Sequence, residues 1–361
     1  MTKKLASSKS PPQILQGMIF QDLSISPFKF DGKIEGYRFP AVIDMHLHGA
    51  FGWDFSFGDP DRIEEMLDKL MSEGLTGVLA TLITCSEEQR EKALKDLVIV
   101  AKRRICPPRI LGIHLEGPFI SPLRRGSHQE KFLLEPSFSS LQKWQQLAEG
   151  MIKMVTIAPE LPEALKLISR AKKTGIIPSI GHSNADHDTT LEAIALGANH
   201  VTHFFNAMRN FKHREPSVVS AILSHPQGTI ELIGDSIHVS PEIIEMMFSI
   251  FPKEHIVLVS DCVCPAGLQD GIFDAYGTHI EFSKGKCTFE GGNLFGGGKL
   301  LLQCISSLKT KTKIPVEVLS NSVSIVPSAV LGIDLPSHDV IVDTEFKWIT
   351  TRFDDFWYWL E

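Results

Sequence analysis

Histidine and carboxylate side chains recur in this sequence at the ends of short apolar runs. The segments DMHLH, GIHLEGPF, SIGHS, VTHFFNAM and LVSDC contain, at or near their ends, His46, His48, Glu116, His182, His203 and Asp261. Imidazole and carboxylate groups bind divalent transition metals, and two histidines spaced two apart in a strand face the same way. One such histidine alone is ordinarily a satisfied polar residue. Their recurrence at successive strand ends predicts a shared metal site.

These residues need a scaffold that gathers the ends of several strands at one mouth. From residue 40 onward, short β-branched runs alternate with amphipathic stretches such as DPDRIEEMLDKLMSEG, which is a βα repeat. Eight strand candidates begin near residues 42, 79, 111, 154, 178, 201, 231 and 257, the number that a (β/α)8 TIM-like barrel requires. A doubly wound α/β sheet is the alternative. Polar residues at the strand ends favour the barrel, whose active sites lie there.

The pattern changes outside this repeat. Residues 1–12 are predicted to be a disordered tail, because Lys, Ser and Pro bury too little surface to offset the cost of ordering. Residues 13–39 and 336–361 contain β-like pieces that we expect to form a small, reduced β-sandwich domain from both termini. Residues 40–335 are predicted to form the barrel. The aromatic end FDDFWYWLE is expected to dock on the protein's own surface or on a partner subunit.

The composition excludes several classes of partner. The 361 residues are 43% hydrophobic and 22% charged, with a formal net charge of −7, which indicates a globular protein and disfavours nucleic acid and anionic membranes as partners. The sequence has no secretory signal and no long apolar run, so we expect a cytoplasmic protein. The six cysteines are too sparse for a disulfide scaffold and are interpreted as reduced thiols.

Other polar residues near these segments receive weaker assignments. His114 precedes Glu116 by two residues and is a minor candidate ligand. Arg124 and Arg125 are interpreted as solvated loop charges or as helpers that make the mouth electropositive for an anion. Cys262 and Cys264 are interpreted as packed thiols. The remaining histidines are assigned to surface or structural roles: His187, His200, His213, His225, His255, His279 and His338.

The combination HLH, HLEGPF, GSH, APE, GHS, THFFNAM, REPS and SD resembles the N-acetylglucosamine-6-phosphate deacetylases of the amidohydrolase superfamily. The match runs from about residue 40 to about residue 300, and HLEGPF with GHSNA and THFFNAM is far more specific than the HxH shared across the superfamily. The resemblance implies an amidohydrolase-type barrel, a homodimer, and hydrolysis of the N-acetyl group of a 6-phosphorylated amino sugar.

The resemblance also implies which residues hold metal. Glu116, His182 and His203 match the family's metal ligands. His46 and His48 match a second, more variable metal position, which favours a two-metal centre with Glu116 bridging. One or two divalent ions per subunit are therefore expected. Zn²⁺ is the first candidate, with Fe²⁺, Mn²⁺ and Co²⁺ as alternatives, because these ligand types accept all four ions.

The same resemblance assigns the catalytic and substrate-binding residues. Asp261 matches the catalytic aspartate, which would act first as base toward water and then as acid toward the leaving amine. His128 matches the residue that holds the acetamide carbonyl and stabilises the oxyanion. The phosphate-binding positions are Asn206, Ala207, His238 and Arg214, the last reaching in from the neighbouring subunit of the dimer.

Several departures from the family pattern keep other functions open. The family's DGxH reads GDSIH here, and its TDA reads SDC. In the family a small-residue segment forms a wall that closes over the sugar. Here NLFGGGKLLLQ replaces that segment and brings Lys299 near this wall of the substrate pocket. The alternatives are a deacetylase for another N-acetylhexosamine phosphate such as the galactosamine epimer, another amidohydrolase, and a non-catalytic sugar-phosphate-binding sensor. The retained metal ligands and Asp261 count against the sensor.

Overall fold

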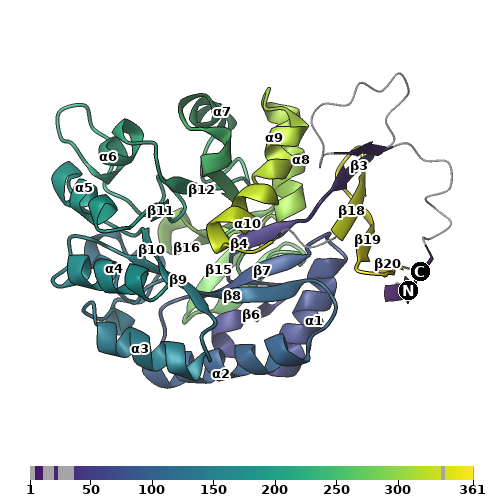
Figure 1. Cartoon of the computed structure of the whole chain (residues 1–361), viewed down its shortest axis with the longest axis horizontal. Helices are drawn as coiled ribbons and strands as arrows, with labels where there is room; N and C mark the ends of the chain where they lie inside the picture. The colour runs from purple at the N-terminus through teal and green to yellow at the C-terminus, as the bar shows by residue number, and fades with distance from the viewer. Residues whose placement is uncertain (1–4, 11–19, 23–35, 335–337, 361) are drawn as a thin grey trace.

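The computed structural model of the chain describes residues 5–10, 20–22, 36–334 and 338–360. Its centre is a sheet of eight parallel strands that neighbour one another in chain order, surrounded by helices (Figure 1). Each strand lies where the sequence predicts one. The strands are β4 (Ile43–Leu47), β7 (Gly77–Leu82), β8 (Arg109–Leu115), β9 (Ile152–Ile157), β10 (Ile177–Ile180), β11 (His200–Val201), β12 (Thr229–Ile233) and β13 (Ile256–Val259).

The first and last strands of this sheet meet at their carboxyl ends. The N–H of Asp261 donates to the carbonyl of His46 at 2.9 Å, and the N–H of His48 donates to the carbonyl of Cys262 at 2.9 Å. A parallel bridge also joins Leu47 to Cys262. These contacts close the sheet into a barrel and bring two predicted site segments together. The (β/α)8 prediction is confirmed.

Helices cover the outside of the barrel, and the amphipathic stretches of the sequence form the first seven of them. Asp59 caps α1 by accepting the N–H groups of Asp61 and Arg62, and Pro60 occupies the first turn. The helices are α1 (Pro60–Met71), α2 (Glu87–Arg103), α3 (Phe138–Leu147), α4 (Ala164–Lys173), α5 (His187–Ala195), α6 (Val218–Ser224), α7 (Pro241–Ile250), α8 (Leu301–Lys311), α9 (Val316–Asn321) and α10 (Ile325–Leu331). Within the described residues, none of the helices has the length and apolar character needed to cross a membrane.

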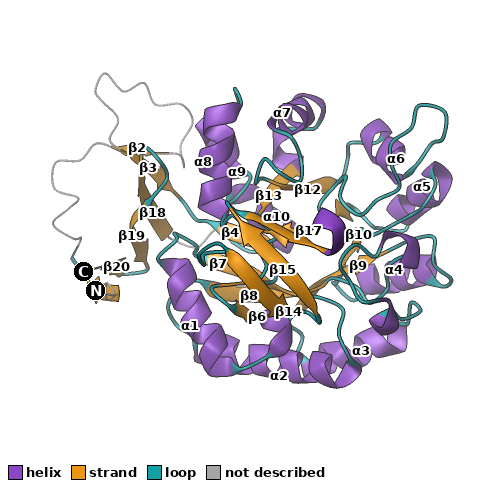
Figure 2. Cartoon of the chain, turned by 180° about the vertical axis from the view of Figure 1, so that it is seen from behind, coloured by secondary structure: helices purple, strands orange, loops and turns teal. Residues whose placement is uncertain are grey.

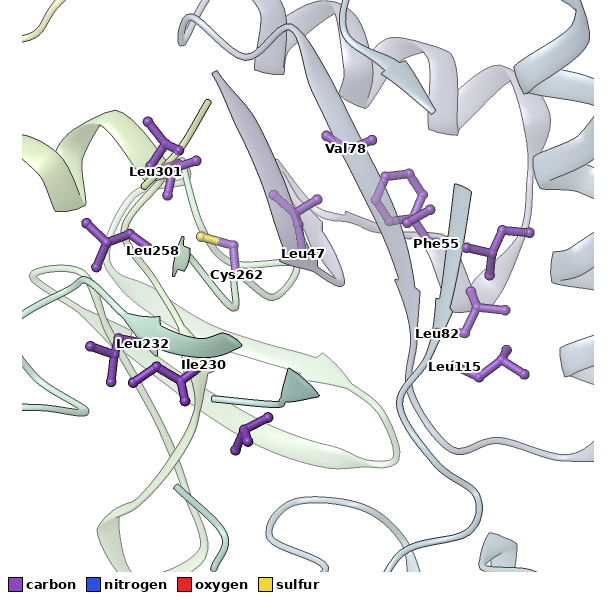
Figure 3. Packing of buried hydrophobic residues seen from close by; sticks show 14 of the residues in the cluster. Leu47, Phe55, Val78, Leu82, Leu115, Ile230, Leu232, Leu258, Cys262 and Leu301 are labelled. Atoms are coloured by element: carbon purple, nitrogen blue, oxygen red, sulfur yellow. The ribbon is translucent and has the colours of Figure 1, made fainter. Parts of the chain in front are cut away.

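Alternation along the barrel strands divides the core into two clusters. On β13, Ile256 and Leu258 belong to the large cluster shared with the helices, whereas Val257 and Val259 belong to a second cluster of barrel-strand residues. Leu301 of α8 lies near Leu258 in Figure 3. The strands are therefore buried on both faces.

Two further sheets and a short hairpin flank the barrel. The segment after β13 forms an antiparallel sheet of β14 (Gly271–Ala275), β15 (Thr278–Ser283), β16 (Lys286–Phe289) and β17 (Asn293–Gly297), whose strands cross in front of the barrel strands in Figure 2. The hairpin joins β5 (Gly49–Ala50) to β6 (Trp53–Asp54).

Both ends of the chain contribute to a six-stranded sheet at one side of the barrel (Figure 2). Its strands are β1 (Leu5–Ser8), β2 (Phe20–Asp22), β3 (Gly36–Phe39), β18 (His338–Asp343), β19 (Trp348–Phe353) and β20 (Phe356–Leu360). β1 pairs antiparallel with β20, which differs from the disordered tail predicted for residues 1–12, because a neighbouring strand supplies backbone partners that the composition does not reveal. Residues 11–19 and 23–35 lie outside the described residues, so the domain boundaries at 13–39 and 336–361 stay a prediction.

Candidate metal centre

Left-handed backbone turns direct three of the predicted site residues into the barrel mouth. His182, His203 and Asp261 follow β10, β11 and β13 and have φ values of 47°, 28° and 52°. Such conformations are strained for residues other than glycine and persist only where the surrounding structure holds them. The ends of three strands are thus bent so that their polar side chains meet.

Glu116, at the end of β8, is the centre of the cluster. One carboxylate oxygen lies 2.8 Å from Nε2 of His203 and 3.0 Å from Nε2 of His182, and these two nitrogens are 3.1 Å apart. All three residues are buried. Burial alone would raise the pKa of Glu116, but its interactions with His128, including a hydrogen bond, and with His46 and His48 lower it well below its usual range. The carboxylate is therefore ionised.

The second predicted pair of histidines lies beside the same carboxylate. Nε2 of His48 is 3.1 Å from Glu116 and 3.5 Å from Asp261, and Nε2 of His46 is 3.4 Å from Glu116 and 3.3 Å from Asp261. Ligand atoms of His46, His48 and Asp261 lie within 4.8 Å of one another, as do those of His46, Glu116 and His203. The structure thus brings together all six strand-end residues.

The hydrogen bonds around this cluster fit a divalent cation. Nδ1 of His182 lies 2.9 Å from the carbonyl of Arg124, which can only accept, so Nδ1 carries the hydrogen and Nε2 of the neutral ring presents a lone pair. That lone pair faces the Glu116 carboxylate and Nε2 of His203. Three electron-pair donors that face one another require a shared cation or protons between them. The donor types suit Zn²⁺ and its neighbours in the first transition row.

Metal binding is expected to release protons from the histidines of this cluster. Burial alone would lower the pKa of His48, but the charge of Glu116 and hydrogen bonds to Asp261 and Glu116 raise it to about 9. The metal-free imidazole is thus protonated below pH 9 and must lose its proton to coordinate. We expect the apparent Zn²⁺ affinity to increase as the pH rises from 6 to about 9 and to level off above that value.

Competition with a chromophoric chelator at each pH, corrected for protonation of the chelator, measures this affinity. Calorimetry in buffers of different ionisation enthalpy counts the released protons. An affinity that does not change over this pH range contradicts the protonation state assigned to the metal-free histidines.

His128 faces the cluster from the loop after β8. Its Nδ1 accepts the N–H of Thr84 at 3.4 Å and lies 2.7 Å from the Thr84 hydroxyl, and its Nε2 lies 3.1 Å from Glu116. A backbone N–H can only donate, so Nδ1 is the acceptor and Nε2 carries the hydrogen. Burial is the main cause that lowers the pKa of His128 to about 4, despite the opposing charge of Glu116. His128 is therefore a neutral hydrogen-bond donor beside the cluster.

A cavity of about 400 Å³ opens over these residues. Asn206, Ala207 and His238, all assigned to phosphate binding by resemblance, line it together with the cluster. Arg214 does not line it and is exposed on the loop before α6. None of the described residues that line the cavity is a lysine or an arginine. A larger hollow of about 1090 Å³, lined by residues that include Asp54 and Tyr276, contains no histidine of the cluster.

The two loop arginines hold the backbone around the site. Nε of Arg124 donates to the side-chain oxygen of Asn184 at 3.0 Å, and Nη1 of Arg125 donates to the carbonyl of His128 at 2.8 Å. The carbonyl of Arg124 in turn accepts from His182. These contacts fix the loop that carries His128, a role that the sequence interpretation did not assign.

The segment that departs most from the family pattern packs against the end of β13. The side chain of Lys299 donates to the carbonyl of Asp235 at 2.8 Å and is not among the residues that line the cavity. A Cβ at Gly297 would lie 2.0 Å from the Ser260 carbonyl oxygen, so only glycine permits this approach. The Asp235 carboxylate lies 2.8 Å from Nδ1 of His238. Lys299 therefore supports the loop that carries His238, and its side chain does not line the cavity.

The sequence interpretation missed one carboxylate of this centre. Glu231 lies within β12 and contacts His46, and also His200, which had been assigned a surface or structural role. His114, the minor candidate ligand, contacts the Thr156 hydroxyl through Nε2 at 2.7 Å. A glutamate in the middle of the apolar run TIELI is the signal that would have found Glu231.

The buried cysteines are packed thiols. Sγ of Cys262 donates to the carbonyl of Lys299 at 3.0 Å, and burial raises its pKa well above the usual range. Burial likewise raises the pKa of Cys264 to about 12. The candidate metal-binding groups among the described residues contain no cysteine. Both thiols are therefore protonated in the metal-free protein.

Comparisons with known proteins identify the family of this chain. Residues 37–340 match the amidohydrolase family. N-acetylglucosamine-6-phosphate deacetylase of Bacillus subtilis (strain 168) is 35% identical over 260 residues, which are 71% of this chain and 66% of that protein. N-acetylgalactosamine-6-phosphate deacetylase of Escherichia coli O157:H7 is 29% identical over 295 residues, 82% of this chain and 78% of that protein.

A solved structure is similar over nearly the whole chain. An Asp-to-Ala mutant of N-acetyl-D-glucosamine-6-phosphate deacetylase from Mycobacterium smegmatis, in complex with N-acetyl-D-glucosamine-6-phosphate, superimposes with a TM-score of 0.83 at 26% identity. The match covers 91% of this chain and 90% of that one. The barrel, the histidine and carboxylate cluster at its mouth and these matches lead to one assignment: the chain belongs to the amidohydrolase family.

Proposed function

We propose that this protein hydrolyses the N-acetyl group of N-acetylglucosamine 6-phosphate, giving glucosamine 6-phosphate and acetate. The observation that carries the proposal is the convergence of Glu116, His182 and His203 on one point, beside a buried carboxylate and a neutral imidazole donor. The names of the relatives support the substrate. The match to the Bacillus subtilis protein spans 66% of that protein.

The cluster is proposed to hold one or two divalent ions. Glu116, His182 and His203 would bind the first, and His46 with His48 would bind the second, with Zn²⁺ as the expected metal. When bound, such a metal lowers the pKa of water toward neutrality and polarises the amide carbonyl.

Two residues of the chain are proposed to handle protons and charge during the reaction. Asp261 takes a proton from the attacking water and later delivers it to the amine nitrogen as the C–N bond breaks, so water adds across the amide bond with no net proton change. The Nε2–H of His128 donates to the acetyl oxygen, where negative charge develops. The low pKa of His128 keeps it neutral, so this N–H does not depend on pH near neutrality.

The phosphate end of the substrate is proposed to lie against Asn206, Ala207 and His238. Burial alone would lower the pKa of His238, but the hydrogen bond to the Asp235 carboxylate raises it, which favours a cationic ring for an anionic ligand. We propose a cytoplasmic homodimer in which Arg214 of the partner subunit adds the missing cation. The exposure of Arg214 and the lack of a lysine or arginine among the described lining residues support this arrangement.

Acetate release from three sugars tests the proposed function. Protein with a counted metal content is given N-acetylglucosamine 6-phosphate, its unphosphorylated form, and N-acetylgalactosamine 6-phosphate. We expect the first to be hydrolysed with a kcat/KM at least about 100-fold above that of the unphosphorylated sugar, since charge-assisted phosphate contacts contribute about 1.5–3 kcal/mol each.

Each other outcome identifies a different function. Preference for the galactosamine epimer moves the assignment to the activity named for the Escherichia coli relative. No release from any sugar by metal-loaded protein overturns the proposed function. Tight binding of the phosphosugars without turnover would indicate a sensor.

A further inference from the structure

Glu231 is a buried carboxylate that the proposed reaction does not use. It lies in the middle of β12, has no exposed surface, and alternates with Ile230 and Leu232, which belong to the cluster shared with the helices. Its side chain therefore points to the other face of the sheet, into the barrel. A carboxylate in such a place is retained only where several partners compensate its lost hydration.

The side chain of Glu231 contacts three histidine residues, two of which are candidate metal ligands. One oxygen lies 3.0 Å from Nδ1 of His46 and also accepts the N–H of His203 at 3.1 Å. The other oxygen lies 3.1 Å from Nε2 of His200. Nδ1 of His200 lies 2.6 Å from the hydroxyl of Thr229, so a continuous chain of polar contacts runs along the sheet to His46. Glu231 thus contacts two of the five candidate metal ligands.

The contact with His46 fixes which nitrogen of that ring is available. An ionised carboxylate only accepts hydrogen bonds, so Nδ1 of His46 carries the hydrogen, and Nε2 of the neutral ring presents a lone pair. Nε2 is the atom that lies 3.4 Å from Glu116 and 3.3 Å from Asp261. It is also a buried nitrogen without a hydrogen-bond partner among the described residues. The ring is held with its lone pair aimed into the centre.

We propose that Glu231 is a positioning residue for the metal centre: it holds His46 as the Nδ1–H tautomer, with Nε2 facing Glu116 and Asp261, so that His46 and His48 would hold the second ion together. The same carboxylate fixes the backbone at His203 and so couples the two metal positions. The inference rests on the proposed function only in requiring a metal-dependent site. Carboxylates that orient metal-binding histidines in this way typically change metal affinity about 10–100-fold when removed.

Titration of metal-free, full-length protein with Co²⁺ alone tests the proposal. Visible absorption follows the geometry of the bound ion, and elemental analysis after gel filtration counts the ions. We expect Glu231→Gln to bind Co²⁺ about 10–100-fold more weakly at the position that includes His46, with an altered spectrum. Addition of metal in excess should restore most of the turnover, because Glu231 does not touch the substrate.

Asp339→Asn is the control. Asp339 is also a buried carboxylate, but it lies in β18 of the terminal sheet and pairs with Arg38 at 3.4 Å and with Arg352 at 2.6 Å. Its variant should keep wild-type Co²⁺ affinity. Equal Co²⁺ affinity and spectra for Glu231→Gln and the wild type overturn the proposal. The proposal is also overturned if the wild-type chain binds a single Co²⁺ and the absorption spectrum of that ion is the same in Glu231→Gln.

A second measurement needs no variant at Glu231, so it can be made even if Glu231→Gln does not fold. In Zn²⁺-loaded protein labelled with ¹⁵N-histidine, the His46 signals, assigned by their loss in His46→Asn, should report a protonated Nδ1 and a metal-bound Nε2. A His46 ring protonated at Nε2 contradicts the proposal. Acetate release is not used in either metal measurement, so failure of the proposed substrate and failure of this inference are distinguishable.

Discussion

Asp261→Asn is expected to lower kcat for the proposed deacetylation about 10²–10⁴-fold, with little change in KM. Asn has nearly the same shape but cannot take a proton from water or deliver one to the leaving amine. Two hydrogen bonds hold the backbone of Asp261. Its N–H donates to the His46 carbonyl at 2.9 Å, and its carbonyl accepts the N–H of Gly297 at 2.6 Å. The substitution should therefore leave the fold of the barrel mouth intact.

The electrostatics of the site make Asp261 suited to the role of base. Burial alone would raise its pKa, but the charge of His46 and a hydrogen bond from His48 lower it, so the carboxylate is ionised before the reaction starts. Steady-state kinetics with metal-loaded protein measures the loss, and elemental analysis shows whether metal is retained.

Asp274→Asn, a change in an exposed carboxylate of β14, is the control for this substitution and should keep wild-type turnover. Retained turnover in Asp261→Asn contradicts the assignment of Asp261 as base. Lost metal together with lost turnover makes Asp261 primarily a ligand, because Oδ1 lies only 3.3 Å from Nε2 of His46.

The location of the centre was predictable because barrel geometry maps sequence position onto space. Residues that follow parallel strands meet at one mouth, whichever strand they follow. His203 shows how robust this rule is: its strand, β11, has only two residues, yet the histidine reaches Glu116. The local sequence does not need to specify the distance between Glu116 and His203, since closure of the barrel does so.

Contacts that depend on the interior or on backbone atoms were not predictable in this way. Glu231 lies within an apolar strand, where the alternating pattern predicts a buried residue and gives no indication of which residues contact it. Lys299 bonds a backbone carbonyl of Asp235, a partner without a sequence signature. Arg125 does the same with the carbonyl of His128. These residues follow from the three-dimensional packing, and each of them supports a residue that the motifs did identify.

Glu116→Gln is expected to remove metal from the centre and to reduce turnover about 10³-fold or more, because metal activation contributes several kcal/mol to the transition state. The Glu116 carboxylate lies between 2.8 and 3.4 Å from five histidine nitrogens, which belong to His46, His48, His128, His182 and His203. The amide of glutamine has the same shape but no negative charge. The variant therefore lacks the anionic group that would balance the charge of a metal ion bound among the histidines. Elemental analysis and acetate release measure the two losses.

A titration of activity against added Zn²⁺ separates a ligand role from a role in folding. If Glu116 binds the metal, Glu116→Gln should regain part of its activity at metal concentrations well above those that saturate the wild type, with unchanged circular dichroism. Glu73→Gln, a carboxylate-to-amide change just after α1, should behave as wild type in both measurements. A Glu116→Gln protein that keeps its metal and its turnover would show that the four candidate histidine ligands, and not this carboxylate, hold the ion. The two-metal arrangement would then lose its bridging group, because in the described structure Glu116 is the only carboxylate within ion-pair distance of all five histidines.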